Sequence, residues 1–253
     1  VAGNLTMAAS SSLGGDAGTA TLTGSLSGSG FSLTKVGAGD VVLGGTSANT
    51  YTGGTTISAG TLTLNKTPGL DATGPSGTIT VNPLGTFGMW ANTTAQLLTR
   101  DIVLAGGRFW NGTGGAVTAG SNIAVNARSM IQRDNGLTFA GVVSGAGTLI
   151  VEGTGLVSLQ NNNPFTGQTI VRNNASLRIG NASGSTGHIF GDISVASGSL
   201  VTFFRNGSND AVENTLYYDD RASAAERYAA RSTSPLTLFC ETPPHDITQT
   251  RSG

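Results

Sequence analysis

Acidic side chains are the first residues in this chain whose type could support catalysis. Six of them stand singly between residues 40 and 192: Asp40, Asp71, Asp101, Asp134, Glu152 and Asp192. Hydrolysis of a glycosidic bond needs two carboxyl groups about 5–10 Å apart. Neighbouring turns of a coiled chain could bring two carboxylates together, but no spacing recurs among these six. The pattern favours carboxylates in turns or on a hydrated surface, with a polysaccharide-acting enzyme as the alternative.

Metal-binding and nucleophilic groups are equally sparse. Asp16 and Asp40 follow glycines, as in a calcium-binding nonapeptide, but neither position recurs in tandem. Cys240 and His245 are too few to bind zinc, which takes about four ligands. His188 has the context of a turn residue, and the Gly-x-Gly triplets lack the third glycine and the helix of a dinucleotide site. We therefore predict no catalytic residue, no metal ion and no cofactor.

Two tryptophans form the one candidate binding site. Trp90 and Trp110 lie 20 residues apart, each directly after a large apolar residue. If one turn of a coil takes about 20 residues, the rings could stack, because aromatic pairs stabilise beyond the area they bury. The alternatives are an aromatic ladder in or on the coil and an exposed platform for a sugar or a protein partner. Four arginines flank the pair and favour the platform: Arg100, Arg108, Arg128 and Arg133.

Composition limits the classes of protein to which the chain can belong. It has 253 residues, 39 of them glycine, and only 11% are charged, against about 25% in ordinary globular chains. An apolar fraction of 38% fills a narrow core, and a net charge of −1 argues against disorder and against nucleic acid as a partner. No apolar run approaches the roughly 20 residues of a membrane helix. The start at Val1 and the single cysteine, Cys240, suggest a fragment of an exported bacterial protein.

Alternation with period two runs through the chain to about residue 205. Leu62 and Leu64 fall on one face of a short strand, with Thr61 and Thr63 on the other, and the same spacing recurs in many segments. Glycines separate these segments, which suits tight corners because glycine adopts positive φ without steric cost. At about 20 residues per full turn of a coil, here called a rung, residues 1–205 would form nine or ten rungs.

Two stretches of the chain are nearly the same. Residues 49–64 read NTYTGGTTISAGTLTL, and residues 163–179 read NPFTGQTIVRNNASLRI. Self-similarity of this kind is typical of solenoids. The second stretch departs from the first at Gln168 and at Asn173-Asn174.

With the preceding Gly-Ala-Gly-Asp segment, the first stretch closely resembles the autotransporter-associated β-strand repeat, also called the passenger-associated transport repeat. The repeats span about 30–64 and 147–179. The residues that carry the resemblance are Gly37, Gly39, Asn49, Tyr51, Gly53, Gly54, Ile57, Gly60, Leu62, Leu64, Gly153, Gly155, Asn163, Phe165, Gly167, Val171, Leu177 and Ile179.

The resemblance implies an all-β fold, a right-handed single-stranded parallel β-helix over residues 1–212. It implies a passenger segment of a type V secreted autotransporter, displayed on the bacterial surface or secreted. The implied partner is a C-terminal membrane β-barrel of the same polyprotein, which this chain does not contain. We expect a monomeric, non-enzymatic stalk that aids folding and export. Binding to a host or glycan surface through Trp90, Trp110 and Arg108 is the further possibility.

The amino-acid composition changes near residue 214. Of the 39 glycines, only Gly253 lies beyond that point, whereas charged and aromatic residues become frequent. Three interpretations stay open for residues 213–253: a shifted reading frame or artificial join, a disordered tail, or a small cap in which 221–231 forms a short helix.

Overall fold

The computed structural model describes residues 1–89, 98, 100–112, 117–181 and 187–204, and the backbone of three strands beyond them. This part of the chain consists of strands and connecting corners without a helix, so the predicted all-β class is confirmed. It also contains no helix that is long and apolar enough to cross a membrane.

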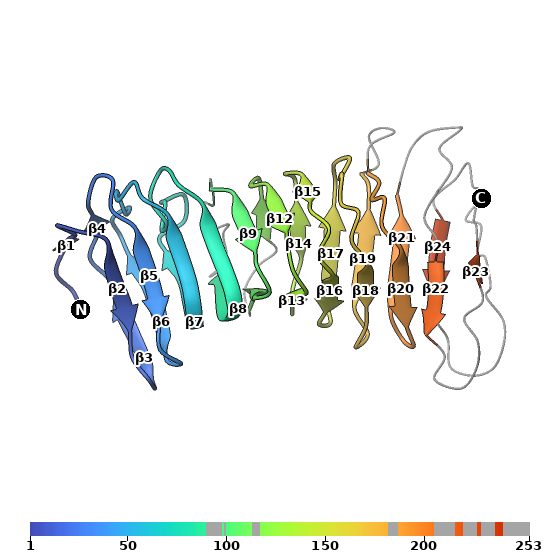
Figure 1. The fold of residues 1–253 in the computed structure, drawn as a ribbon, viewed down its shortest axis with the longest axis horizontal. Coiled ribbons are helices and arrows are strands. Elements are labelled where there is room, and N and C mark those ends of the chain that lie inside the picture. The colour runs from blue at the N-terminus through green and yellow to red at the C-terminus, as the bar shows by residue number, and fades with distance from the viewer. Residues whose placement is uncertain are drawn as a thin grey trace.

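The strands stack in parallel into an elongated β-solenoid, which runs from β1 at one end to β21 and the strands after it at the other (Figure 1). The strands are β1 (Leu5–Thr6), β2 (Ser11–Gly14), β3 (Thr19–Leu22), β4 (Leu26–Ser27), β5 (Leu33–Val36), β6 (Asp40–Gly45), β7 (Thr55–Lys66), β8 (Ile79–Met89), β9 (Ile102–Leu104), β10 (Arg108–Asn111), β11 (Val117–Ala119), β12 (Ile123–Val125), β13 (Ser129–Arg133), β14 (Leu137–Phe139), β15 (Val143–Ser144), β16 (Leu149–Glu152), β17 (Leu156–Leu159), β18 (Thr169–Val171), β19 (Ser176–Ile179), β20 (Ile193–Ala196) and β21 (Leu200–Phe203).

The rungs are longer than the sequence suggested. Register partners lie 20 residues apart at Leu149 and Thr169 but 25 apart at Thr61 and Thr86. The solenoid therefore has about 8 turns, and the expected nine or ten rungs were wrong. Part of the extra length lies in the corners between strands, and one residue enters as a register shift between Ile57 and Ala59 where β7 pairs with β8.

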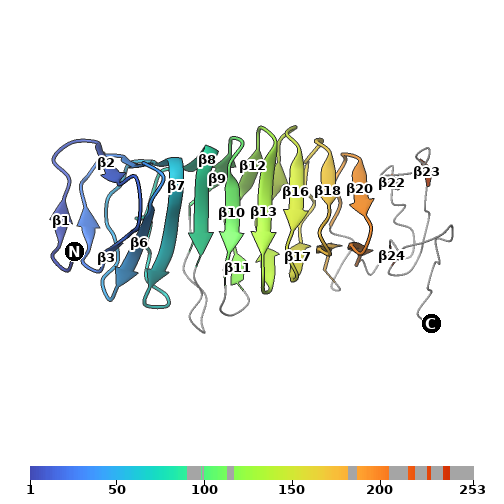
Figure 2. The same cartoon turned by 90° about the horizontal axis from the view of Figure 1, so that it is seen from below.

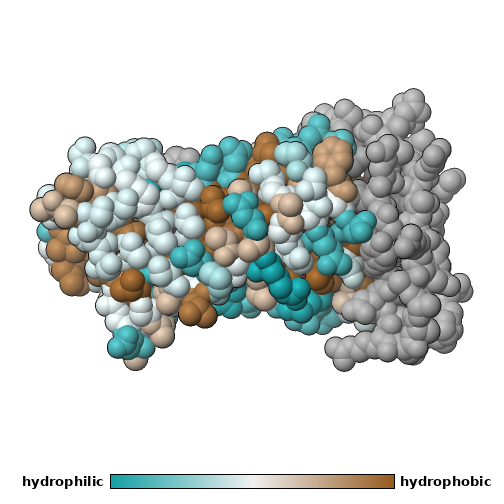
Figure 3. Space-filling model, viewed as in Figure 1, coloured by the Kyte–Doolittle hydropathy of each residue, from teal (hydrophilic) through white to brown (hydrophobic). Residues whose placement is uncertain are grey.

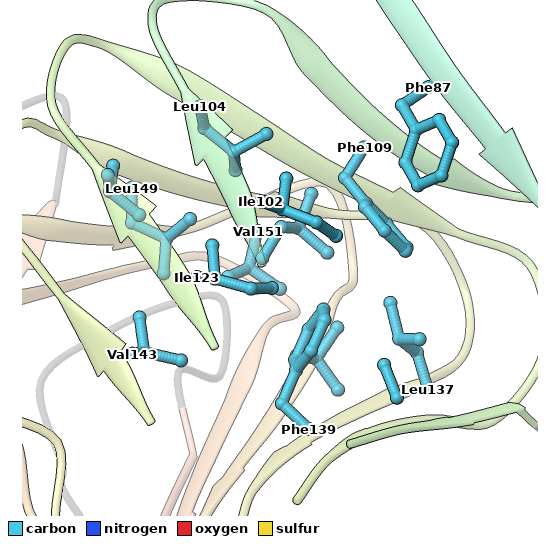
Figure 4. Packing of buried hydrophobic residues seen from close by; sticks show 14 of the residues in the cluster. Phe87, Ile102, Leu104, Phe109, Ile123, Leu137, Phe139, Val143, Leu149 and Val151 are labelled. Carbon is cyan, nitrogen blue, oxygen red and sulfur yellow. The ribbon is translucent and has the colours of Figure 1, made fainter. Parts of the chain in front are cut away.

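The core of the described residues consists of one large cluster that runs along the axis of the coil and a smaller one near its N-terminal end. Inward side chains alternate with outward ones, as in β12, where Ile123 and Val125 are buried and Ala124 is half-buried. Phe87, Phe109 and Phe139 stack edge to face inside the coil, with ring centroids 5.5 and 5.6 Å apart (Figure 4). The outer surface mixes pale, polar and scattered apolar residues on the face that Figure 3 shows, as expected where threonine and serine take the outward positions.

Three further strands follow residue 204: β22 (Leu216–Asp219), β23 (Arg227–Tyr228) and β24 (Leu236–Phe239). β22 continues the parallel stack on β20, whereas β23 pairs antiparallel with β22 and β24 antiparallel with β21. The strand at 227–228 does not fit the short helix considered for 221–231. The boundary predicted at residue 212 lies outside the described residues.

Candidate functional site

The first repeat extends over two successive rungs, which stack on each other and on their neighbours. β5 and β6 precede the long strand β7, which pairs with both of them and then with β8. Ile57, Leu62 and Leu64 of β7 point inward and are fully buried. The alternation of leucine with threonine therefore places the apolar side chains in the core and leaves the threonines outside.

Asn49 ties three rungs together from inside a corner. Its side chain is buried; Oδ1 accepts a hydrogen bond from the backbone N–H of Leu26 at 2.8 Å, and Nδ2 donates to the carbonyl of Ala72 at 2.7 Å. These backbone groups belong to the preceding and the following rung. Because a buried N–H or C=O without a partner is costly, Asn49 satisfies two groups that strand pairing does not reach.

Asn163 takes the same place in the second repeat. Its Oδ1 accepts from the backbone N–H of Val143 at 2.8 Å, which repeats the bond of Asn49 to the preceding rung. Its Nδ2 donates instead to Asn161, within its own rung. The two repeats thus share the bond to the preceding rung and differ in the bond to the following one.

The aromatic residue two positions later is buried in both repeats. Phe165 lies in the main core, whereas Tyr51 packs with Leu33 and neighbouring side chains in a smaller cluster near the N-terminal end. The Tyr51 hydroxyl shares a hydrogen bond of 2.7 Å with Oγ1 of Thr55, and the guanidinium of Arg100 lies 5.3 Å from the ring centroid. Burial raises the pKa of Tyr51. Tyr51 is therefore a packing residue with a satisfied hydroxyl.

The corner glycines of the repeat serve two different needs. Gly37 and Gly60 have φ of 72° and 66°, which is the left-handed region. Gly53 does not, but a Cβ there would lie 2.2 Å from the carbonyl oxygen of Phe31 in the preceding rung. In the second repeat Asn173 and Asn174 adopt φ of 57° and 60°. Asparagine tolerates this conformation better than most residues. The second repeat therefore has asparagines where the first has Ala59 and Gly60, but its corner is still left-handed.

Gly60→Ala is expected to destabilise the fold more than Gly69→Ala. Both glycines have positive φ, which costs a residue with a Cβ about 1–2 kcal/mol. A Cβ at Gly69 meets no atom, whereas one at Gly60 would lie 2.4 and 2.5 Å from the carbonyl oxygens of Gly39 and Gly37 and 2.6 Å from Nζ of Lys35. The extra loss at Gly60 should be about 1–3 kcal/mol, the usual cost of overpacking. Urea unfolding measures it, and equal losses in the two variants would show that this corner can open to accept a methyl group.

Buried basic side chains occur in the coil and were not expected there. Lys35 donates to the carbonyls of Val36, Gly37 and Ala59 at 2.8, 2.8 and 3.0 Å. Lys66 donates to the carbonyl of Gly44 at 2.8 Å. Among the described residues the buried charged groups are all basic, so carbonyl oxygens rather than carboxylates compensate these ammonium groups. The sequence carried one sign of this burial: Lys35 and Lys66 each stand two residues after an inward leucine, Leu33 or Leu64, and so occupy inward positions of the alternation.

Arg100 and Arg133 are also buried, which contradicts the expectation that they flank a surface platform. Arg100 donates from Nε to the carbonyl of Gly77 at 2.9 Å and from its other nitrogens to the carbonyls of Thr73 and Gly53. Nε and Nη1 of Arg133 have no hydrogen-bond partner, and burial lowers the pKa of Arg133 to about 10. Arg100 thus binds neighbouring rungs together, whereas Arg133 has two buried nitrogens without a partner and only the nearby charge of Asp134 to oppose the lowering of its pKa.

The two lysines should make stability depend on pH in the alkaline range. Burial lowers the pKa of Lys35 and of Lys66 below the ordinary 10.5, and Asp40 partly opposes the shift at Lys35. Just below that pH the unfolded chain binds more protons than the folded chain, so the free energy of unfolding should rise with pH. Arg133, with its pKa lowered to about 10, adds to this rise at the upper end of the range. Above pH 10.0 the raised pKa of Tyr51 acts in the opposite direction.

Urea unfolding from about pH 8 to pH 10 tests this dependence. A Lys35→Met, Lys66→Met double variant should lose most of the slope, whatever its absolute stability. An unchanged slope in that variant would contradict the assignment to these lysines.

The remaining predicted binding residues lie on the outer surface or outside the described part. Trp90 is outside the described residues. Trp110 points outward from β10 and is half-buried, and its register partner in β8 is Gly88. Arg108 also points outward and donates from Nη1 to Oε1 of Gln132 at 2.8 Å. The ladder inside the coil consists of phenylalanines, so Trp110 is not part of it.

The carboxylates do not converge in the described part of the chain. Asp40 has Thr19 and Thr61 as register partners, and Glu152 has Gln132 and pairs with Arg172. No group of three or more metal-ligating side chains occurs among the described residues. This arrangement supports the interpretation of these carboxylates as turn and surface residues.

The comparisons with known proteins identify the repeat. Residues 33–64 match the family model of the passenger-associated transport repeat. No curated protein and no solved structure matches the chain. The matched residues coincide with β5, β6 and most of β7, and because β7 stacks on β5 and β6, the match extends over two successive rungs joined at the corner that contains Asn49. The repeat and the β-solenoid together fit a structural passenger stalk.

Proposed function

We propose that this chain is a segment of an autotransporter passenger, exported to the bacterial surface as a stalk whose folding aids export. The observation that carries the proposal is the position of the matched repeat. Residues 33–64 extend over two successive rungs, and Asn49 at the corner between their strands binds backbone groups 23 residues before and 23 residues after it. A C-terminal translocator of the same polyprotein is the partner that this repeat implies.

Folding by addition of rungs gives the proposed mechanism. In a solenoid each rung contacts mainly its neighbours, so stability is close to a sum of rung and interface terms. A folded rung presents paired strands and open carbonyl groups that accept the next rung. Each rung added outside the cell would bury apolar side chains such as Ile57 and Leu62 and oppose backward movement of the chain. Export could then proceed without a nucleotide.

A Tyr51→Asp, Leu62→Asp double variant tests the proposal. Both side chains are fully buried, and an isolated carboxylate in an apolar core is strongly disfavoured. With the chain joined to a translocator barrel in a Gram-negative cell, the variant should reach the surface more slowly and in smaller amounts. Surface labelling against total protein at successive times measures this.

Thr61→Asp is the matched control, because Thr61 lies on the same strand but points outward and is half-buried. It should reach the surface at the wild-type rate. Normal surface appearance of the double variant would sink the proposal that stacking of this rung drives export. Adhesion is a separate question, which the export assay does not address.

A further inference from the structure

The outer face of four neighbouring strands carries an ordered row of side chains. β10, β13, β16 and β18 lie side by side, and the described chain does not cross in front of them (Figure 2). Trp110 has Gln132 as its register partner, and Gln132 has Glu152. Arg172 follows β18 and pairs with Glu152. We call Trp110, Arg108, Gln132, Glu152 and Arg172 the outer row.

The indole ring of Trp110 rests on two glycines. A Cβ at Gly88 would lie 3.1 Å from Cε3 of the ring, and a Cβ at Gly112 would lie 2.6 Å from Cζ2 and from Cη2. The six-membered ring therefore reaches across the backbone at both positions. Trp110 is half-buried, and we take the part of the ring that does not pack on these glycines as the surface for a ligand.

The polar members of the outer row are held in place by their neighbours. Arg108 is hydrogen-bonded to Gln132, and Arg172 is paired with Glu152. Arg108 uses one of its several N–H donors in that bond, and a guanidinium binds a carboxylate through two parallel bonds. The row thus places fixed donors beside an aromatic face.

We propose that the outer row binds an acidic oligosaccharide, with one sugar ring on Trp110 and a uronate carboxylate at Arg108. Aromatic faces and a few convergent polar groups are the usual elements of a ligand site. A peptide strand is disfavoured because these strands already pair on both sides, so they offer no free edge. Met130, Ile150 and Ile170 are register partners beside the row. Ile150 is only 4% exposed, so it offers little apolar surface on which an apolar helix could dock.

Tryptophan fluorescence tests the proposal on the full chain. Trp90→Phe leaves Trp110 as the sole tryptophan. Hexasaccharides of hyaluronan and of polygalacturonate are the acidic probes, and cellohexaose is the neutral one. At least one acidic probe should change the emission of Trp110 saturably and bind several-fold more tightly than cellohexaose. Absence of saturable binding by both acidic probes would overturn the proposal, and equal affinity for cellohexaose would remove the role given to Arg108.

Variants separate the site from the fold. In the wild-type chain, calorimetric titration with the better probe should lose at least tenfold in affinity in Trp110→Ala and in Arg108→Ala. Gly112→Ala should also weaken binding, because its Cβ displaces the ring, whereas Gly120→Ala meets no atom and should not. Arg178→Ala, on another sheet, is the control for loss of an outward arginine. Undiminished binding by Trp110→Ala would refute the site.

The proposal does not depend on the proposed export function. Trp110→Ala should reach the cell surface normally and lose the oligosaccharide, whereas the Tyr51→Asp, Leu62→Asp variant should reach the surface more slowly and in smaller amounts. The binding result for Trp110→Ala therefore tests the oligosaccharide site alone, and the export result for the double variant tests the export proposal alone.

Discussion

Phe109→Ala should lower the free energy of unfolding by about 3–5 kcal/mol, the range for large aromatic residues removed from a core. Phe109 is fully buried and is the middle ring of the ladder, in edge contact with Phe87 and with Phe139. Truncation leaves a cavity between three rungs and removes both ring contacts. The strands above and below are fixed by their own pairing, so the coil has little freedom to close the cavity.

Urea unfolding followed by circular dichroism measures this loss. Phe190→Ala is the matched control, because Phe190 is 61% exposed, and surface substitutions usually change stability by no more than about 0.5 kcal/mol. Comparable losses in the two variants would show that the ladder does not stabilise the middle of the solenoid.

Asn49→Leu should cost roughly 2–6 kcal/mol, because it leaves two buried backbone groups without partners at about 1–3 kcal/mol each. Leucine has the same branching and the same number of side-chain heavy atoms, so it leaves no cavity, and the loss reports on the N–H of Leu26 and the C=O of Ala72. These two backbone groups lie in the rungs before and after Asn49. Without the bond to Leu26, the N-terminal rungs should open first.

Hydrogen exchange measures this local opening. The Leu26 amide should lose protection in Asn49→Leu, whereas the Val143 amide, bound by Asn163, should keep it. Asn126→Leu, at an exposed position, is the stability control. Retained protection of Leu26 would mean that another acceptor replaces Asn49 and would contradict its bridging role.

The repeat was visible in the sequence because its geometry depends on residue type at each position. A corner needs glycine or asparagine for positive φ, as at Gly60 and Asn174, and a strand buried on one face needs alternation, as at Leu62 and Leu64. Both requirements are local. The all-β class, the stacked coil and the identity of the repeat therefore followed from the sequence.

The number of rungs did not follow from the sequence, because the length of the corners varies while the alternation in the strands stays the same. Trp110 illustrates the effect of this variation. An offset of 20 residues predicts Trp90 as its neighbour, but the register offset is 22, and Gly88 lies there. Gly88 lets the ring of Trp110 lie against the coil. Counting residues along the sequence could not predict this neighbour, because the length of the corner was unknown.

The sequence by itself determined the strand alternation, the corner residues and the repeat, because each depends on a few neighbouring residues. The tertiary structure decided which polar groups are buried and what compensates them. Lys35 and Arg100 bind carbonyl groups up to 24 and 47 residues away, and these partners come within reach only after the rungs stack in one register. Backbone carbonyls are present at every residue, so no residue type marks which of them will accept a buried cation.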